Sequence, residues 1–179
     1  MKAAKKVLIA YATVHGSTTE IAEYMAKLLG EHHFDVTTAN VETLESVAGY
    51  DAYILGSAIH AGMWLPSMSR FLDRFEDELA KAPVYFFVTC IRVLEPEGEQ
   101  HVLEHYLHRD TLERIHTRDI AVFAGKLRLD AIDLRDRWTL ALRYDGSHAP
   151  GTINDDYRDC NIIHDWTARV CSALDKPAS

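Results

Sequence analysis

The sequence predicts a three-layer α/β domain in which a doubly wound sheet of five parallel strands lies between two layers of helices. Short apolar runs alternate with amphipathic helical patterns along nearly the whole chain. The apolar runs are continuous, which is typical of strands that are buried on both faces. With 179 residues, of which 47% are hydrophobic and 26% charged, the chain has the size and composition of one globular domain. We therefore expect a single domain over residues 1–179.

Five segments have the pattern of strands. Residues 7–12 and 52–56 are apolar throughout, so both strands are expected to be buried on both faces. Residues 34–40 are more polar, which is typical of a strand at the edge of a sheet. The other two predicted strands cover residues 84–88 and 120–124.

Four segments have the periodicity of helices. Apolar residues recur at helical spacing from Ile21 to Leu29, and Gly30 is placed to end that helix. Residues 66–81 form an amphipathic pattern, with charged residues opposite an apolar face. The other two predicted helices, one polar and one amphipathic, cover residues 98–115 and 162–174. This alternation of strands and helices predicts helices on both faces of a parallel sheet.

One segment interrupts the alternation. Residues 127–159 separate the fifth strand from the last helix, although such connections usually take about 2–6 residues. Within this insertion, residues 131–142 have the spacing of a short amphipathic helix with Trp138 in its apolar stripe. Long connections are often functional, so we expect the stripe to cover the domain itself, a second subunit or a hydrophobic substrate.

The loop after the first predicted strand carries the clearest chemical signal. Residues 13–19 are rich in hydroxyl groups, include one glycine and lead into a helix. Ligands of open parallel sheets bind beyond the carboxyl ends of the strands, and the free N–H groups at a helix start attract anions. Because the loop has neither a lysine nor GxGxxG spacing, it favours a phosphate monoester over a triphosphate or a dinucleotide. The alternative is an ordinary capped helix start.

The spacing Tyr11-x-Thr13-x-x-Gly16-x-Thr18-x-x-x-Ala22 resembles the flavodoxin signature, in which this loop binds the phosphate of FMN. The resemblance implies a flavodoxin-like sheet in the order 2-1-3-4-5. It also implies a non-covalent FMN cofactor through which the protein transfers electrons. It implies no catalytic side chain, because the flavin carries the redox chemistry.

Later segments narrow the resemblance to the flavodoxin-like protoporphyrinogen oxidases that use menaquinone. The similar segments, in the same order, are residues 56–62, residues 124–128, the pair Asp136-Arg137 and the pair Asp165-Trp166. That subfamily also carries an insertion after the fifth strand, but a strongly basic one that lies against a membrane. Residues 126–145 here hold five basic and four acidic residues, so we expect at most peripheral membrane contact. A protoporphyrinogen-oxidising or quinone-reducing enzyme is therefore the alternative to an electron carrier.

The resemblance places FMN among three loops at the carboxyl ends of the strands. The residues expected to contact it are Thr13, His15, Gly16, Ser17, Thr18 and Thr19 in the first loop, Ser57, Ala58, Ile59, His60, Gly62 and Trp64 in the second, Thr89, Cys90, Ile91 and Arg92 in the third, and Gly125 after the fifth strand. For three of them a second interpretation stays open. Trp64 either stacks on the isoalloxazine ring or packs at the start of the next helix. His60 and Arg92 either contact the flavin or are solvated.

Composition and charge limit the partners. The net charge of −8 argues against nucleic-acid binding, because phosphate backbones require a basic surface. Three cysteines without CxxC spacing fit a reducing compartment, and with no signal-peptide pattern they predict a cytoplasmic protein. The expected partner is a redox protein or a small molecule such as a quinone or porphyrinogen. A homodimer is a further alternative.

Three rival interpretations have less support. His101, Glu104, His105 and His108 share helical spacing, but no second cluster of ligands accompanies them, so no metal site is expected. A receiver domain shares this architecture, but it needs an acceptor aspartate at the end of the third strand, where Gly56 stands. A flavodoxin-like fold that has lost its flavin and acts as a binding module is the last alternative.

Overall fold

The computed structural model describes residues 3–126 and 156–176, so most of the predicted insertion, including Trp138, lies outside the described residues. Five parallel strands form a sheet in the order β2-β1-β3-β5-β6, and a short strand β4 pairs antiparallel with β3. Since β4 is an addition, this is the predicted order 2-1-3-4-5, with the polar strand at the edge. The strands are β1 (Lys6–Ala12), β2 (Asp35–Asn40), β3 (Ala52–His60), β4 (Met63–Trp64), β5 (Val84–Thr89) and β6 (Thr117–Phe123).

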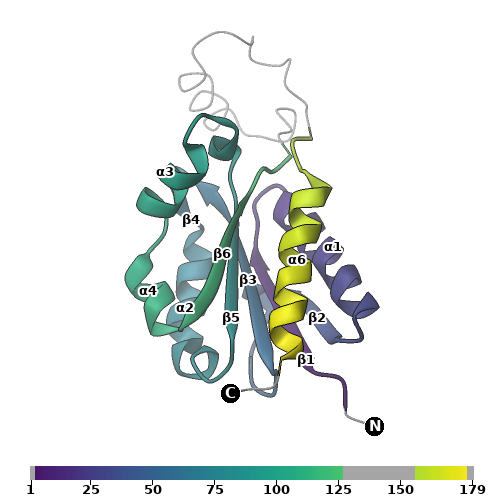
Figure 1. The fold of residues 1–179 in the computed structure, drawn as a ribbon. Coiled ribbons are helices and arrows are strands. Elements are labelled where there is room, and N and C mark those ends of the chain that lie inside the picture. Colours follow the sequence, from purple (N-terminus) through teal and green to yellow (C-terminus); the bar gives the residue numbers. More distant parts are fainter. Residues whose placement is uncertain (1–2, 127–155, 177–179) are drawn as a thin grey trace.

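Helices cover both faces of the sheet, which gives the three predicted layers (Figure 1). Successive residues of a strand point to opposite faces, so each buried strand feeds two cores. Leu8 and Phe86 enter the core under α2, α3 and α4, whereas Ile9 and Phe87 enter the core under α1 and α6. The helices are α1 (Ser17–Glu31), α2 (Pro66–Leu79), α3 (Gly98–His105), α4 (Arg109–Arg114) and α6 (Cys160–Asp175), with short 3-10 helices η1 (Val41–Thr43) and η2 (Ile91–Leu94).

The carboxyl ends of the central strands lie in line. Ala12 at the end of β1 is paired with Ser57, and the next residue of β3, Ala58, is paired with Thr89 at the end of β5. Thr89 is in turn paired with Phe123, the last residue of β6. The loops that follow these strands therefore start side by side at one edge of the sheet.

Strand β3 is longer than predicted, because it continues into a hairpin. The predicted strand ended at Gly56, but β3 extends to His60 and pairs with β4. Ala61 and Gly62 connect the two strands with φ values of 50° and 79°. Positive φ at both positions is the geometry that fits a two-residue turn to the twist of a hairpin.

Two helices also differ from the prediction. Helix α1 continues to Glu31, and His33 instead of Gly30 takes the left-handed conformation after it, with φ 65°. The predicted helix over residues 98–115 is divided into α3 and α4. Tyr106 and Leu107, at the division, are both buried. The next residue, His108, leaves the helical conformation with a ψ of 86° and becomes the N-cap of α4, which separates the two helices.

Candidate functional site

The loop between β1 and α1 has the geometry of an anion site. Gly16 has a left-handed φ of 88° and precedes α1, for which the described residues provide no side-chain cap. The Gly16 N–H donates to Thr13 Oγ1 at 3.0 Å, which fixes the turn. The Glu20 N–H donates to the Gly16 carbonyl at 3.1 Å. The N–H groups before Glu20 in the first turn therefore have no partner within the helix, and a ligand oxygen can supply one.

Two other strand ends meet this loop. Thr18 Oγ1 lies 2.9 Å from Thr89 Oγ1, and this buried pair joins the first turn of α1 to the end of β5. Gly125, just after β6, lies so close to the first turn of α1 that a Cβ there would be 3.1 Å from Ser17 Oγ. The same Cβ would lie 3.9 Å from Thr89 Cβ. The segments after β1, β5 and β6 thus form one surface, and the Thr18 hydroxyl is engaged in holding it together.

The second predicted loop is the hairpin of β3 and β4. Ser57 is buried, and its Oγ accepts a hydrogen bond from the Leu65 N–H at 3.0 Å and donates one to the Ala58 carbonyl at 2.9 Å. These bonds tie the hairpin to the start of α2. Ala58 and Ile59 are half-buried, whereas His60 is exposed. The tip of the hairpin packs against the C-terminal end of α3. A Cβ at Gly62 would lie 3.4 Å from the ring of Tyr106, the residue that caps this end.

Trp64 lies in the core below this edge. Its side chain is 1% exposed, and its indole N–H donates to Ser69 Oγ at 2.8 Å. Its ring centroid lies 5.2 Å from that of Phe86 and 4.6 Å from that of His108. These contacts correspond to the packing interpretation of Trp64.

The third predicted loop follows β5 and is held at both ends. The Cys90 N–H donates to the Phe123 carbonyl at 2.9 Å, which ties the loop to β6. Arg92 Nε lies 3.1 Å from Glu95 Oε2, so this guanidinium has a carboxylate partner of its own. A Cβ at Gly98 would lie 1.9 Å from the Arg92 carbonyl oxygen. Only a glycine at that position allows α3 to begin so close to the loop.

Residues 156–159, which we call the return segment, lead into α6 beside the first loop. Lys126 and Asp156 form an antiparallel bridge. The Tyr157 N–H donates to the Gly125 carbonyl at 3.3 Å. Lys126, just before the predicted insertion, and Asp156, near its end, therefore lie at the same edge of the sheet as the three loops (Figure 1).

Arg158 in the return segment forms ion pairs with two carboxylates. Its Nε donates to Asp156 Oδ1 at 2.7 Å, and its terminal nitrogens contact Asp156 and Glu20 in the first turn of α1. The hydrogen bond from Arg158 lowers the pKa of Asp156 to about 2. The same hydrogen bond raises the pKa of the guanidinium, which is therefore always charged. No sequence pattern marks Arg158, because its partner Glu20 is brought to it by the fold.

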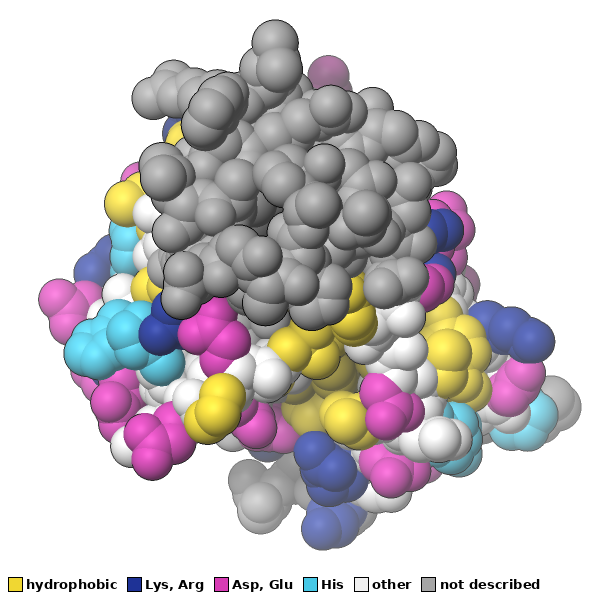
Figure 2. Space-filling view, turned by 90° about the horizontal axis from the view of Figure 1, so that it is seen from above, with side chains coloured by type: hydrophobic (Ala, Val, Ile, Leu, Met, Phe, Trp, Pro, Cys, Tyr) yellow, Lys and Arg dark blue, Asp and Glu magenta, His cyan; other side chains and the backbone are white. Residues whose placement is uncertain are grey.

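Figure 2 looks down on this end of the molecule, where histidine side chains gather at the margin on the side of α3. The rings of His101 and His105 lie 4.6 Å apart. Among residues 3–126 and 156–176, no group of three or more histidine, cysteine or acidic side chains is arranged to hold a metal ion. Within the same ranges, no helix has both the length and the apolar character to cross a membrane.

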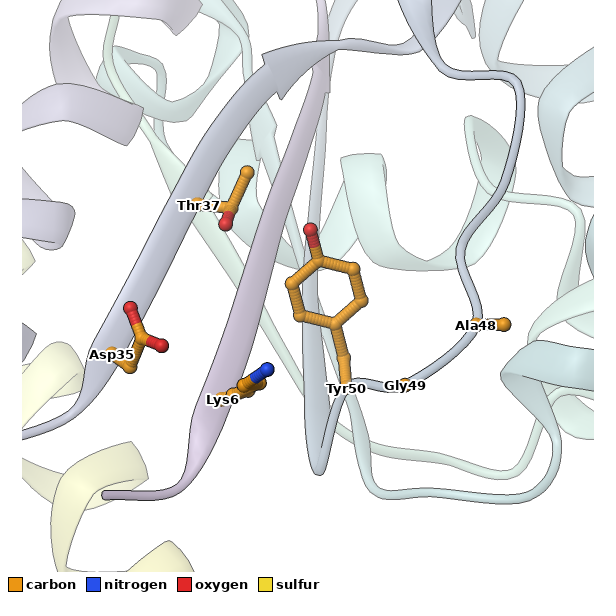
Figure 3. A pocket seen from close by; sticks show the side chains of 6 residues that line it. All are labelled: Lys6, Asp35, Thr37, Ala48, Gly49 and Tyr50. Carbon is orange, nitrogen blue, oxygen red and sulfur yellow. The ribbon is translucent and has the colours of Figure 1, made fainter. Parts of the chain in front are cut away.

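A hollow of about 220 Å³ lies at the opposite end of the sheet (Figure 3). Its lining side chains are exposed or half-buried and come from the starts of β1 and β2 and from the loop before β3. Ligands of parallel sheets bind at the carboxyl ends of the strands, so this hollow is not the candidate site. The lining residues are Lys6, Asp35, Thr37, Ala48, Gly49 and Tyr50.

Comparison with known proteins agrees with this geometry. A family model described as a flavodoxin domain matches residues 8–150. Protoporphyrinogen IX dehydrogenase (quinone) from Escherichia coli is 25% identical over 177 residues, which cover 96% of this chain and 98% of that protein. An archaeal flavodoxin aligns with a TM-score of 0.59 at 12% identity, over 96% of this chain and 99% of that one. A flavodoxin variant from Pseudomonas aeruginosa aligns with a TM-score of 0.58 at 14% identity, over the same shares.

Proposed function

We propose that this chain, which belongs to the flavodoxin family, binds one FMN without a covalent bond and transfers electrons through it. The observation that carries the proposal is the uncapped start of α1, where the left-handed Gly16 leaves first-turn N–H groups available to phosphate oxygens. When bound, the flavin supplies the reversible gain and loss of electrons. The protein supplies its position and its electrostatic surroundings.

Each of the three loops would contact a particular part of the cofactor. The phosphate would be held by N–H groups of residues 13–19 and by hydroxyl groups of this loop other than that of Thr18, which is buried against Thr89. The isoalloxazine ring would lie between residues 57–62 and residues 89–92, because the register of β3 and β5 places these two loops side by side. FMN is favoured over FAD, since the sequence carries no GxGxxG motif, which binds the pyrophosphate of a dinucleotide.

We expect FMN, and not FAD, to be released when the purified protein is denatured. The measurement is chromatography of the released flavin against both standards, together with the visible spectrum before denaturation. A colourless preparation whose apoprotein takes up no FMN would instead support the flavin-free binding module. FAD as the main flavin would contradict the assignment of the phosphate loop.

Thr18→Val should lower the stability of the fold by about 1–3 kcal/mol, the usual cost of leaving a buried polar group without its partner, and should also weaken FMN binding. The change removes the hydroxyl that joins the first turn of α1 to Thr89, so the N–H groups that face the phosphate lose their support. Titration of the apoprotein with FMN, followed by flavin fluorescence, measures the effect. Thr167→Val is the matched control, because it removes a buried hydroxyl from α6, where Thr167 bonds to Ile163. Equal affinities in both variants would show that the Thr18–Thr89 pair does not support the site.

A second candidate function is an enzyme that oxidises a porphyrinogen or reduces a quinone. The similarity to the Escherichia coli dehydrogenase favours it, because that similarity extends over nearly the full length of both chains. Turnover of protoporphyrinogen IX and of a quinone, measured side by side with reduction of a redox protein, separates an enzyme from a carrier. We place the protein in the cytoplasm, because Cys90, Cys160 and Cys171, all among the described residues, form no disulfide bond with one another.

A further inference from the structure

The start of α1 carries a negative charge that opposes an anionic ligand. Glu20 lies in the first turn of α1, one residue after the N–H groups that face the anion site. Asp156 in the return segment adds a second carboxylate on the same side, through its contact with Arg158. A phosphate dianion beside two uncompensated carboxylates is repelled, and helix-end charges act most strongly within one turn.

We infer that Arg158 is a positioning residue for the cofactor phosphate: by pairing with Glu20 and Asp156 it removes the repulsion that these carboxylates would exert on the anion site. The inference rests on the proposed FMN function. The Arg158 side chain is 19% exposed, compared with 49% for Glu20 and 41% for Asp156. The partly buried cation is therefore screened less by solvent and salt than a surface arginine would be.

Two independent contacts place Arg158 beside the phosphate loop. Its guanidinium contacts Glu20, whose N–H in turn bonds to the Gly16 carbonyl. The N–H of the preceding residue, Tyr157, bonds to the carbonyl of Gly125, where an added Cβ would lie 3.1 Å from Ser17 Oγ. The return segment therefore contacts the start of α1 from one side and the Gly125 turn from the other.

The test compares FMN with riboflavin, which has the same ring system but no phosphate. Arg158→Gln should weaken FMN binding by roughly five- to tenfold, because it leaves Glu20 without this partner and Asp156 with the charge of Lys126 in place of the paired guanidinium. Its affinity for riboflavin should not change. Glu20→Gln should act in the opposite direction and tighten FMN binding by about two- to fivefold, again without an effect on riboflavin.

Three further variants exclude a merely structural role. Arg169→Gln removes the same charge from an exposed position of α6 and should leave both affinities unchanged. Arg158→Lys keeps the charge and should keep most of the preference for FMN. The double variant Glu20→Gln/Arg158→Gln should regain affinity for FMN relative to Arg158→Gln alone.

The outcomes separate the inference from the proposed function. If the wild-type protein binds neither flavin, the proposed function fails and the role of Arg158 fails with it. If the wild-type protein prefers FMN and Arg158→Gln keeps the same preference, only the inference is overturned. Equal weakening of FMN and riboflavin by Arg158→Gln, or weaker FMN binding by Glu20→Gln, would also overturn it, since both indicate loss of structure instead of loss of charge compensation.

Discussion

Gly16→Val should weaken FMN binding by about 3 kcal/mol, roughly a hundredfold. Gly16 has φ 88°, a conformation that L-residues adopt at a cost of about 1–2 kcal/mol, so the variant loop tends to leave it. A Cβ at Gly16 would meet no protein atom within 4 Å, so the added side chain enters the open space over the start of α1. That is the space in which we place the phosphate. Titration of the apoprotein with FMN measures the loss.

Gly49→Val is a closely matched control. Gly49 also has a left-handed φ, 86°, and a Cβ there would also meet nothing within 4 Å. It lines the hollow at the opposite end of the sheet, however (Figure 3). Both variants should lose similar thermal stability without ligand, and only Gly16→Val should lose FMN affinity. Equal affinities for FMN would mean that the phosphate does not lie at Gly16.

Replacement of residues 130–147 by a short Gly/Ser linker should leave FMN binding largely intact but reduce turnover with the physiological partner at least about tenfold, the equivalent of ~1.4 kcal/mol. A short linker suffices, because Lys126 and Asp156 are bridged and bridged residues lie about 5 Å apart. The bridge places Lys126 and Asp156, the described residues before and after this segment, at the edge of the sheet that carries the loops. We therefore propose that its apolar stripe, with Trp138, contacts a substrate or a second subunit.

Three readouts decide the role of this segment: FMN affinity, oligomeric state in solution and turnover with a quinone or redox protein. A truncated protein that keeps all three at the wild-type level would show that the segment has no role in cofactor binding, assembly or turnover. A truncated protein that does not fold would show that the apolar stripe belongs to the core of the domain.

The sequence predicted the sheet well because continuous apolar runs leave few alternatives for buried parallel strands. It predicted β3 less well, since Ser57, Ala58 and His60 are polar or small and the strand conformation of this end depends on pairing with β4 and β5. The division between α3 and α4 depends on where Tyr106 and Leu107 find space in the core, which periodicity alone does not show.

The candidate site was predicted as a set of loops but not as a set of contacts. The spacing of residues 11–22 indicates a phosphate loop, because the local strand-loop-helix order already determines its geometry. The contacts of Thr18 with Thr89 and of Gly125 with Ser17 join segments that are far apart in the chain. Arg158 could not have been found from the sequence, because its partner Glu20 lies 138 residues away.

The most direct measurement of the central claim is an anaerobic titration of the apoprotein, first with FMN and then with a reductant. We expect one FMN to bind per chain, with loss of flavin fluorescence. The yellow absorbance of the complex should disappear on reduction and return on oxidation while the flavin stays bound. An apoprotein that binds no FMN, or a bound flavin that cannot be reduced and reoxidised in place, would contradict the assignment of this chain as an FMN-dependent electron-transfer protein.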